Sequence, residues 1–144
     1  MNHSTPKVRK LARGLLALEA TATTTVGSDM PAAFRVCEKL RRTLVRLAGV
    51  AGFRSLISRT LALAAQEASW LQELRIGADG SLERLADAEA KLSSSEVERG
   101  ETALVAQLIT LLFSFVGEAL TMRLLQESWG EARAVDLDSR SKRK

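Results

Sequence analysis

The sequence predicts an all-α protein: a compact bundle of about five helices, with two long helices at its centre. Leu, Ala, Arg and Glu dominate the composition, Tyr is absent and Pro is rare, and straight-chain residues lose little rotamer freedom in a helix. Apolar residues recur at spacings of three and four, and no segment shows the alternation of a strand. With 144 residues, 46% of them hydrophobic, the chain can bury a core of its own.

The first half of the chain predicts two helices. Residues 6–20 form the first, with a proline in its first turn, where a missing N–H costs nothing. The threonine-rich residues 21–27 predict a loop. The second helix begins around Pro31, after a Ser-Asp pair that can cap it, and presents one apolar face. Gly49–Gly52 then predicts a turn or a tight kink.

The third helix is predicted over residues 51–76. Its polar residues fall on one narrow stripe, so we expect it to be one of the two central helices. Residues 77–80, Gly-Ala-Asp-Gly, predict a turn. Residues 81–92 predict a short fourth helix, followed by a run of serines.

The fifth helix is predicted from the capping-box pair Ser95 and Glu98 to about Trp129. Its apolar stretch, Ala103–Gly117, has fifteen residues, whereas a membrane span needs about 20. We therefore expect a buried core helix, the second of the central pair. Gly117 in its interior predicts a close approach of another helix, within the chain or across a dimer.

Three segments resemble a group of small, uncharacterised bacterial helical proteins. The segments are CEKLRR at 37–42, AGFRSL at 51–56 and FVGEALT at 115–121. The resemblance covers residues 34–129 and implies an all-helical fold, with no activity, cofactor or site residue attached. For the chain as a whole we expect a disordered start at 1–6, one helical domain over 7–133, and a disordered basic tail at 134–144.

The charge of the chain is divided along its length. Residues 1–60 carry eleven Lys/Arg against three Asp/Glu, and residues 61–139 carry six against fourteen. The last five residues add four more cations. Opposed halves can satisfy each other within one fold, between subunits or against a partner, and the sequence leaves these alternatives open.

A row of cations on the second helix is the predicted partner-binding surface. Its members, spaced four, three and four apart, are Arg35, Lys39, Arg42 and Arg46. Such a row can dock an acidic partner helix or follow nucleic-acid phosphates. The alternative is a solvated face, or a face paired with the acidic residues of the chain itself.

Residues 44–61 allow a helix-turn-helix motif, which would support a nucleic-acid-binding function. Arg54, Ser55, Ser58 and Arg59 would then face a major groove, where Arg commonly reads guanine. Against this motif, Ser58 is polar where a buried aliphatic residue is needed. The helix that would read the DNA is also long and mostly apolar, as in a core helix.

Glu118 lies on a polar seam of the otherwise apolar fifth helix. If the seam is buried, Glu118 needs a partner, and we expect a structural ion pair with Arg54 or Arg59. The functional alternative, a proton acceptor in a pocket, lacks a second carboxylate, His or Lys beside it in the sequence.

The sequence predicts no catalytic, cofactor-binding or metal-binding residue, because no phosphate loop, Cys/His cluster or nucleophile motif occurs. Cys37, the only cysteine, falls on an apolar face and suits a core position in a reducing cytoplasm. His3, the only histidine, falls in the expected disordered start. A reactive thiol at Cys37 is the functional alternative.

The predicted function is a small, cytoplasmic, non-enzymatic adaptor or regulator that self-associates as a homodimer and docks a partner through charged helix faces. The alternative is a nucleic-acid-binding protein that uses the basic N-terminal half. A third hypothesis is a peripheral membrane protein whose basic tail and first helix touch anionic lipid.

Overall fold

A computed structural model describes residues 5–22 and 30–129 and confirms the all-α class. Its helices are α1 (Pro6–Ala22), α2 (Ala32–Ala65), the 3-10 helix η1 (Ser69–Glu73), α3 (Leu85–Glu89) and α4 (Ser94–Val116), and residues 118–129 are helical as well. Two short strands complete the fold, β1 (Arg75–Ile76) and β2 (Leu82–Glu83). The predictions for His3, for the Ser-Asp cap, for most of the 21–27 loop and for the basic tail lie outside the described residues.

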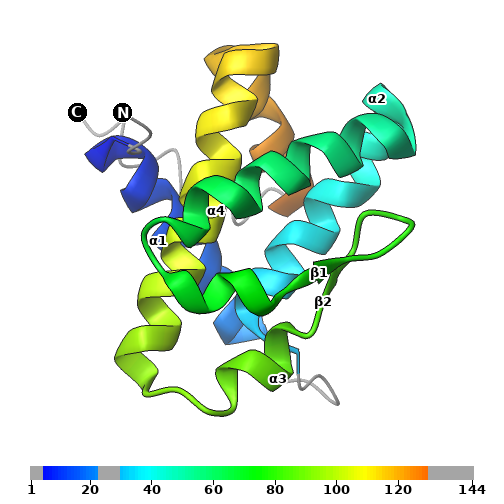
Figure 1. The fold of residues 1–144 in the computed structure, drawn as a ribbon. Coiled ribbons are helices and arrows are strands. Elements are labelled where there is room, and N and C mark those ends of the chain that lie inside the picture. Colours follow the sequence, from blue (N-terminus) through cyan, green and yellow to red (C-terminus); the bar gives the residue numbers. More distant parts are fainter. Residues whose placement is uncertain (1–4, 23–29, 130–144) are drawn as a thin grey trace, which may run out of the picture.

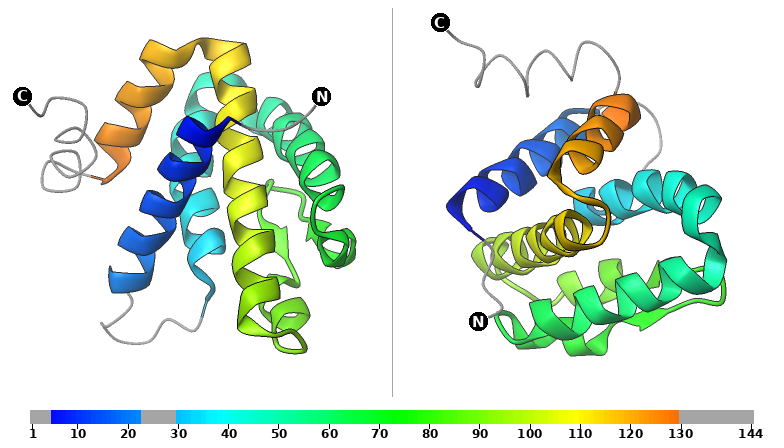
Figure 2. Two further views of the ribbon diagram at one scale, coloured as in Figure 1. Left: turned by 90° about the vertical axis from the view of Figure 1, so that its left-hand side faces the viewer. Right: turned by 90° about the horizontal axis from the view of Figure 1, so that it is seen from above.

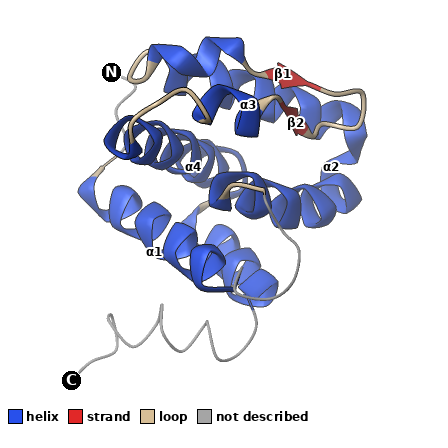
Figure 3. Cartoon of the chain, turned by 90° about the horizontal axis from the view of Figure 1, so that it is seen from below, coloured by secondary structure: helices blue, strands red, loops and turns tan. Residues whose placement is uncertain are grey.

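Helix α4 is the centre of the bundle, as predicted for the fifth helix. It packs against α1 and α2 and lies between α1 and the second half of α2 (Figures 2 and 3). Every residue from Gly100 to Ile109 is buried, which explains why this stretch is apolar on nearly all sides. The other predicted central helix, over residues 51–76, corresponds in part to the second half of α2. It lies on one side of α4 (Figures 2 and 3), and its polar residues Ser55, Ser58 and Arg59 are exposed.

The chain between α2 and α4 differs most from the prediction (Figure 1). The third predicted helix ends at Ala65 instead of residue 76, and the chain turns so that Leu71 and Leu74 are buried. The burial of these side chains outweighs the helix propensity of the segment. The expectation of no strand is wrong, because Arg75 pairs with Glu83 and Ile76 with Leu82 in antiparallel register. Strands of two residues are too short to show alternation.

The capping box of α4 lies two residues earlier than predicted. The side chain of Ser93 accepts a hydrogen bond from the Glu96 backbone N–H, and the Glu96 carboxylate accepts one from Ser93 N–H. The first turn of α4 contacts Trp70, whose indole N–H donates to the Glu96 carbonyl at 3.2 Å. Gly100 provides room for the same ring, because a Cβ there would lie 2.2 Å from it.

Two glycines interrupt the long helices. Gly49 breaks α2 with φ 81° and ψ 166°, which confirms a kink in the predicted place. Gly117 ends α4 with φ 92° and ψ 155°, a region that only glycine commonly adopts. No helix of the described chain approaches Gly117 closely, since a Cβ there would meet no atom within 4 Å. The alternative, a close approach across a dimer, stays a prediction. Both breaks lie at the same end of the bundle, uppermost in Figure 1 and in the left view of Figure 2.

Replacing Gly49 with Ala is expected to lower the free energy of unfolding by about 1–3 kcal/mol. The added methyl group meets no atom within 4 Å, so the whole cost is backbone strain at positive φ. Urea unfolding measures this change, with Val50→Ala at the exposed neighbouring position as the control. A Gly49→Ala variant as stable as the native chain would contradict the claim that the positive φ at this position requires glycine.

Candidate functional site

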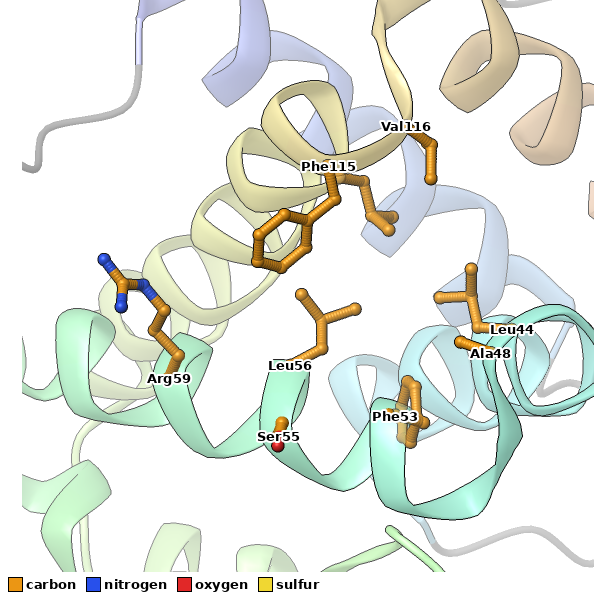
Figure 4. Close-up of a pocket in the computed structure, with 10 residues that line it drawn as sticks. Leu44, Ala48, Phe53, Ser55, Leu56, Arg59, Phe115 and Val116 are labelled. Carbon is orange, nitrogen blue, oxygen red and sulfur yellow. The ribbon is translucent and has the colours of Figure 1, made fainter.

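An apolar groove opens at the end of the bundle where the two glycine breaks lie. Its volume is about 500 Å³. The two halves of α2 and the end of α4 form its walls, and their side chains converge on it in Figure 4. We define the apolar groove by its apolar lining residues, which are Leu44, Ala48, Phe53, Leu56, Leu112, Phe115 and Val116.

Large apolar side chains remain exposed close to the two glycine breaks in the sequence. Phe115 is 63% exposed and Leu47 is 61% exposed, and Val50 and Leu120 are also exposed. All four lie within three residues of one of the glycine breaks, and they make up four of the five large exposed apolar side chains of the described chain. Phe115 also lines the groove, and an exposed aromatic side chain at an apolar groove is typical of an interaction surface.

The groove is basic at its rim. Among the described residues that line it, Arg59 is the only charged one, and Ser55 adds a hydroxyl group. Arg59 forms no ion pair with any residue that the structure describes. The groove therefore combines an apolar interior with one cation that has no counter-charge.

Glu118 pairs with Lys7 of α1 instead of with Arg54 or Arg59, which corrects the predicted ion pair. The break at Gly117 sends residues 118–129 back beside α1 (Figure 2), and this places Glu118 away from the groove. Both partners are more than half exposed. Arg54 instead donates from Nε to the Gly77 carbonyl at 3.2 Å and holds α2 to the turn between β1 and β2.

The structure divides the predicted basic row into two pairs. Arg35 and Lys39 contact the carboxylate of Glu19 at 3.2 Å and 2.9 Å. Arg42 and Arg46 are exposed and form no ion pair within the described part of the chain. Half of the row is thus paired within the fold. Binding of a partner by the row stays a prediction, and within the described chain only Arg42 and Arg46 have no ion pair that a partner would have to replace.

Glu19 is the buried carboxylate at the centre of a polar cluster that joins three elements. We call this set the Glu19 cluster: Glu19 of α1, Arg35 and Lys39 of α2, and Trp129. Glu19 is 3% exposed and accepts a hydrogen bond from Trp129 Nε1 at 2.9 Å, and Lys39 Nζ lies 5.1 Å from the centroid of the Trp129 ring. Burial alone would raise the pKa of Glu19, but hydrogen bonds from Lys39, Arg35 and Trp129 outweigh it and hold the pKa below its usual value.

Further ion pairs join the two oppositely charged parts of the chain within the fold. Arg9 of α1 pairs with Glu67, which also accepts a hydrogen bond from Gln107 of α4. The Arg41 guanidinium of α2 lies 3.7 Å from the carboxylate of Asp79 in the turn between β1 and β2. Part of the charge division therefore serves the fold itself.

Two carboxyl groups meet between α3 and α4. Burial raises the pKa of Glu89 to about 9. A hydrogen bond with Glu101 and the negative charge of Glu101 both add to this effect. Glu89 consequently keeps its proton at neutral pH. Neither residue lines the apolar groove, so the pair is a structural contact of the fold and not part of the candidate site.

Cys37 lies in the hydrophobic core, as predicted. Burial, together with the charges of Glu38 and Glu101, raises the pKa of the thiol to about 12, so it is a poor nucleophile at neutral pH. Within residues 5–22 and 30–129, no group of three or more His, Cys, Asp or Glu side chains is placed to hold a metal ion.

The segment proposed as a helix-turn-helix consists of two helical halves of α2 that meet at Gly49, without a turn of several residues between them. Residues 44–61 all belong to α2, and Gly49 alone departs from helical φ and ψ, whereas the motif joins two helices by a turn of three or four residues. Ser58 and Arg59 are exposed, as a reading face requires. Arg54, however, already donates to the turn of the strand pair.

Two helices, α2 and α4, are long and apolar enough to cross a membrane by length and composition. The complete α4 meets this test although its uninterrupted apolar stretch is shorter than a span. In each helix the test applies to an apolar stretch of 18 residues. Two thirds of this stretch in α4 and one third in α2 are buried inside the bundle. The core helix of a bundle has the same length and composition, so this observation alone assigns neither helix to a membrane.

Sequence reasoning missed the groove and the Glu19 cluster. Glu19 follows an apolar run at the end of the first predicted helix, where an isolated carboxylate could have signalled a buried partner. Phe115 falls in the apolar stretch that was predicted to be core, but it lies two residues before the break at Gly117 and is exposed. No protein-family model, curated protein or solved structure matches this chain.

Proposed function

We propose that this chain is a cytoplasmic, non-enzymatic interaction module whose apolar groove docks an α-helix of a partner protein. The observation that carries the proposal is the open apolar groove, about 500 Å³ in volume, whose lining residue Phe115 is 63% exposed. An amphipathic helix buries such a surface with side chains at i, i+3 or i+4 and i+7.

A helix explains the surface better than a smaller ligand does. A small molecule inside the groove would leave the outer part of Phe115 in water, because this lining side chain is 63% exposed. A helix laid along the open groove would cover the lining residues and the exposed part of Phe115 together. The nucleic-acid alternative is less well supported, since Arg35 and Lys39 are engaged with Glu19.

A labelled, stapled helical peptide with leucines at i, i+3 and i+7, and glutamine at its other exposed positions, tests the proposal. We expect the native chain to bind it and Phe115→Ser to bind it at least about tenfold more weakly, since an exposed aromatic anchor is lost. Fluorescence anisotropy measures both affinities. Met30→Ser removes an exposed apolar side chain that does not line the groove and should leave binding unchanged. No binding by the native chain, or equal binding by Phe115→Ser, would overturn the proposal.

A further inference from the structure

We infer that the apolar groove selects a partner helix with an acidic side chain about one turn beyond its apolar stripe, and that Arg59 is the residue that recognises it. This inference rests on the proposed function and specifies the chemistry of the partner. It is carried by the position of Arg59 at one end of the groove and by the absence of an acidic residue among those that line it.

The geometry fixes where the acidic side chain belongs. Gly52 and Arg59 both line the groove, and their separation of seven positions corresponds to about 10 Å of α-helix. The groove therefore takes about two turns of a helix. Figure 4 shows the Arg59 guanidinium at one end, beside Phe115, and Leu44 and Ala48 at the other. A charged contact consequently falls at one end of the docked stripe and not in its middle.

The electrostatics fix the sign of the partner's charge. Docking would remove water from the Arg59 guanidinium, which has no ion pair with any described residue to compensate for that loss. Glu118 lies next to the break at Gly117 but is engaged by Lys7 on the other side of α4. A carboxylate on the partner supplies the missing charge, and a lysine at the same position would be repelled.

The same charge argues against a second copy of this chain as the occupant. Two copies that met groove to groove would bring their Arg59 side chains to one interface, where no lining residue is acidic. The homodimer predicted from the sequence would therefore have to use another face. An anionic lipid surface shares the favourable charge, but a bilayer is flat at this scale and does not fill a groove that three helical segments enclose.

A charge exchange tests the inference. Three stapled leucine peptides that differ only in the residue one turn beyond the last leucine (Glu, Gln or Lys) are titrated at low salt. We expect the native chain to bind the Glu peptide about fivefold more tightly than the Lys peptide, the range of a partly exposed ion pair. Arg59→Glu should reverse the order. Arg99→Glu, at an exposed position of α4 that does not line the groove, should keep the native order and controls for net charge.

The outcomes separate the inference from the proposed function. Equal binding of the Glu and Lys peptides, unaltered by Arg59→Glu, overturns the inference and leaves helix docking in place. Failure of all three peptides overturns the proposed function itself. Binding of anionic phospholipid vesicles that depends on Phe115 and Arg59, without peptide binding, overturns both in favour of a lipid surface. A native dimer in sedimentation that Phe115→Ser dissociates overturns the inference in favour of a second copy.

Discussion

Replacing Glu19 with Gln is expected to lower the free energy of unfolding by about 3 kcal/mol at neutral pH. The substitution keeps the size of the side chain but removes the charge that Arg35 and Lys39 contact in the interior. It also places an amide N–H₂ group among the donors of the Glu19 cluster. Because the cluster joins α1, α2 and Trp129, urea unfolding should show the loss in one cooperative transition.

The pH dependence of this loss identifies its cause. The pKa of Glu19 is held below its usual value, so its stabilisation is present above about pH 4.5 and is lost as the pH falls through the lowered pKa. The difference between native chain and variant should therefore shrink in acid. Glu118→Gln, which breaks the exposed pair with Lys7, should cost less than about 1 kcal/mol. Equal losses in the two variants would contradict the role of the Glu19 cluster.

Glu89→Gln is expected to make the protein more stable than the native chain at alkaline pH. The pKa of Glu89 is raised to about 9, so the folded state holds a proton that the unfolded state releases above about pH 4.5. The stability of the native chain should therefore fall as the pH rises from about 4.5 to about 9. Glutamine is neutral at every pH and removes this dependence.

Thermal unfolding over this range measures the effect. For a chain of this size, we expect the native midpoint to fall by about 5 °C or more between about pH 6 and about pH 9, and the Glu89→Gln midpoint to stay nearly constant. Asp87→Asn removes an exposed carboxylate from the same helix and should follow the native profile. A Glu89→Gln profile parallel to the native one would show that Glu89 does not hold its proton in the folded state.

The sequence predicted the helical class, the central apolar helix and the kink at Gly49, because each depends on local pattern. The segment from Gln66 to Leu92 was predicted less well. There the burial of Leu71 and Leu74 decides the path of the chain, and such tertiary contacts leave no periodic signal. The serine run before α4 allows a capping box with Ser93 and Glu96 or with Ser95 and Glu98. The structure has the first pair, and Trp70 donates a hydrogen bond to the Glu96 carbonyl.

The candidate site was harder to predict than the fold. Its apolar residues have the helical spacing of core residues, and only the break at Gly117 reveals that Phe115 ends in solvent. The basic row was correctly placed on one face of α2, yet Arg35 and Lys39 are engaged by Glu19, sixteen or more residues earlier. A row of cations alone does not show which of its members are paired within the fold.

Methyl NMR of the native chain, with and without the Glu-bearing leucine peptide, tests the central claim most directly. If the apolar groove docks a helix, the methyl resonances of Leu44, Leu56 and Val116 should shift on titration, and those of Val8 and Leu15 in α1 should stay in place. Shifts centred on α1 or on the exposed row at Arg42 and Arg46, or no shifts at all, would contradict the claim that the groove is the binding site.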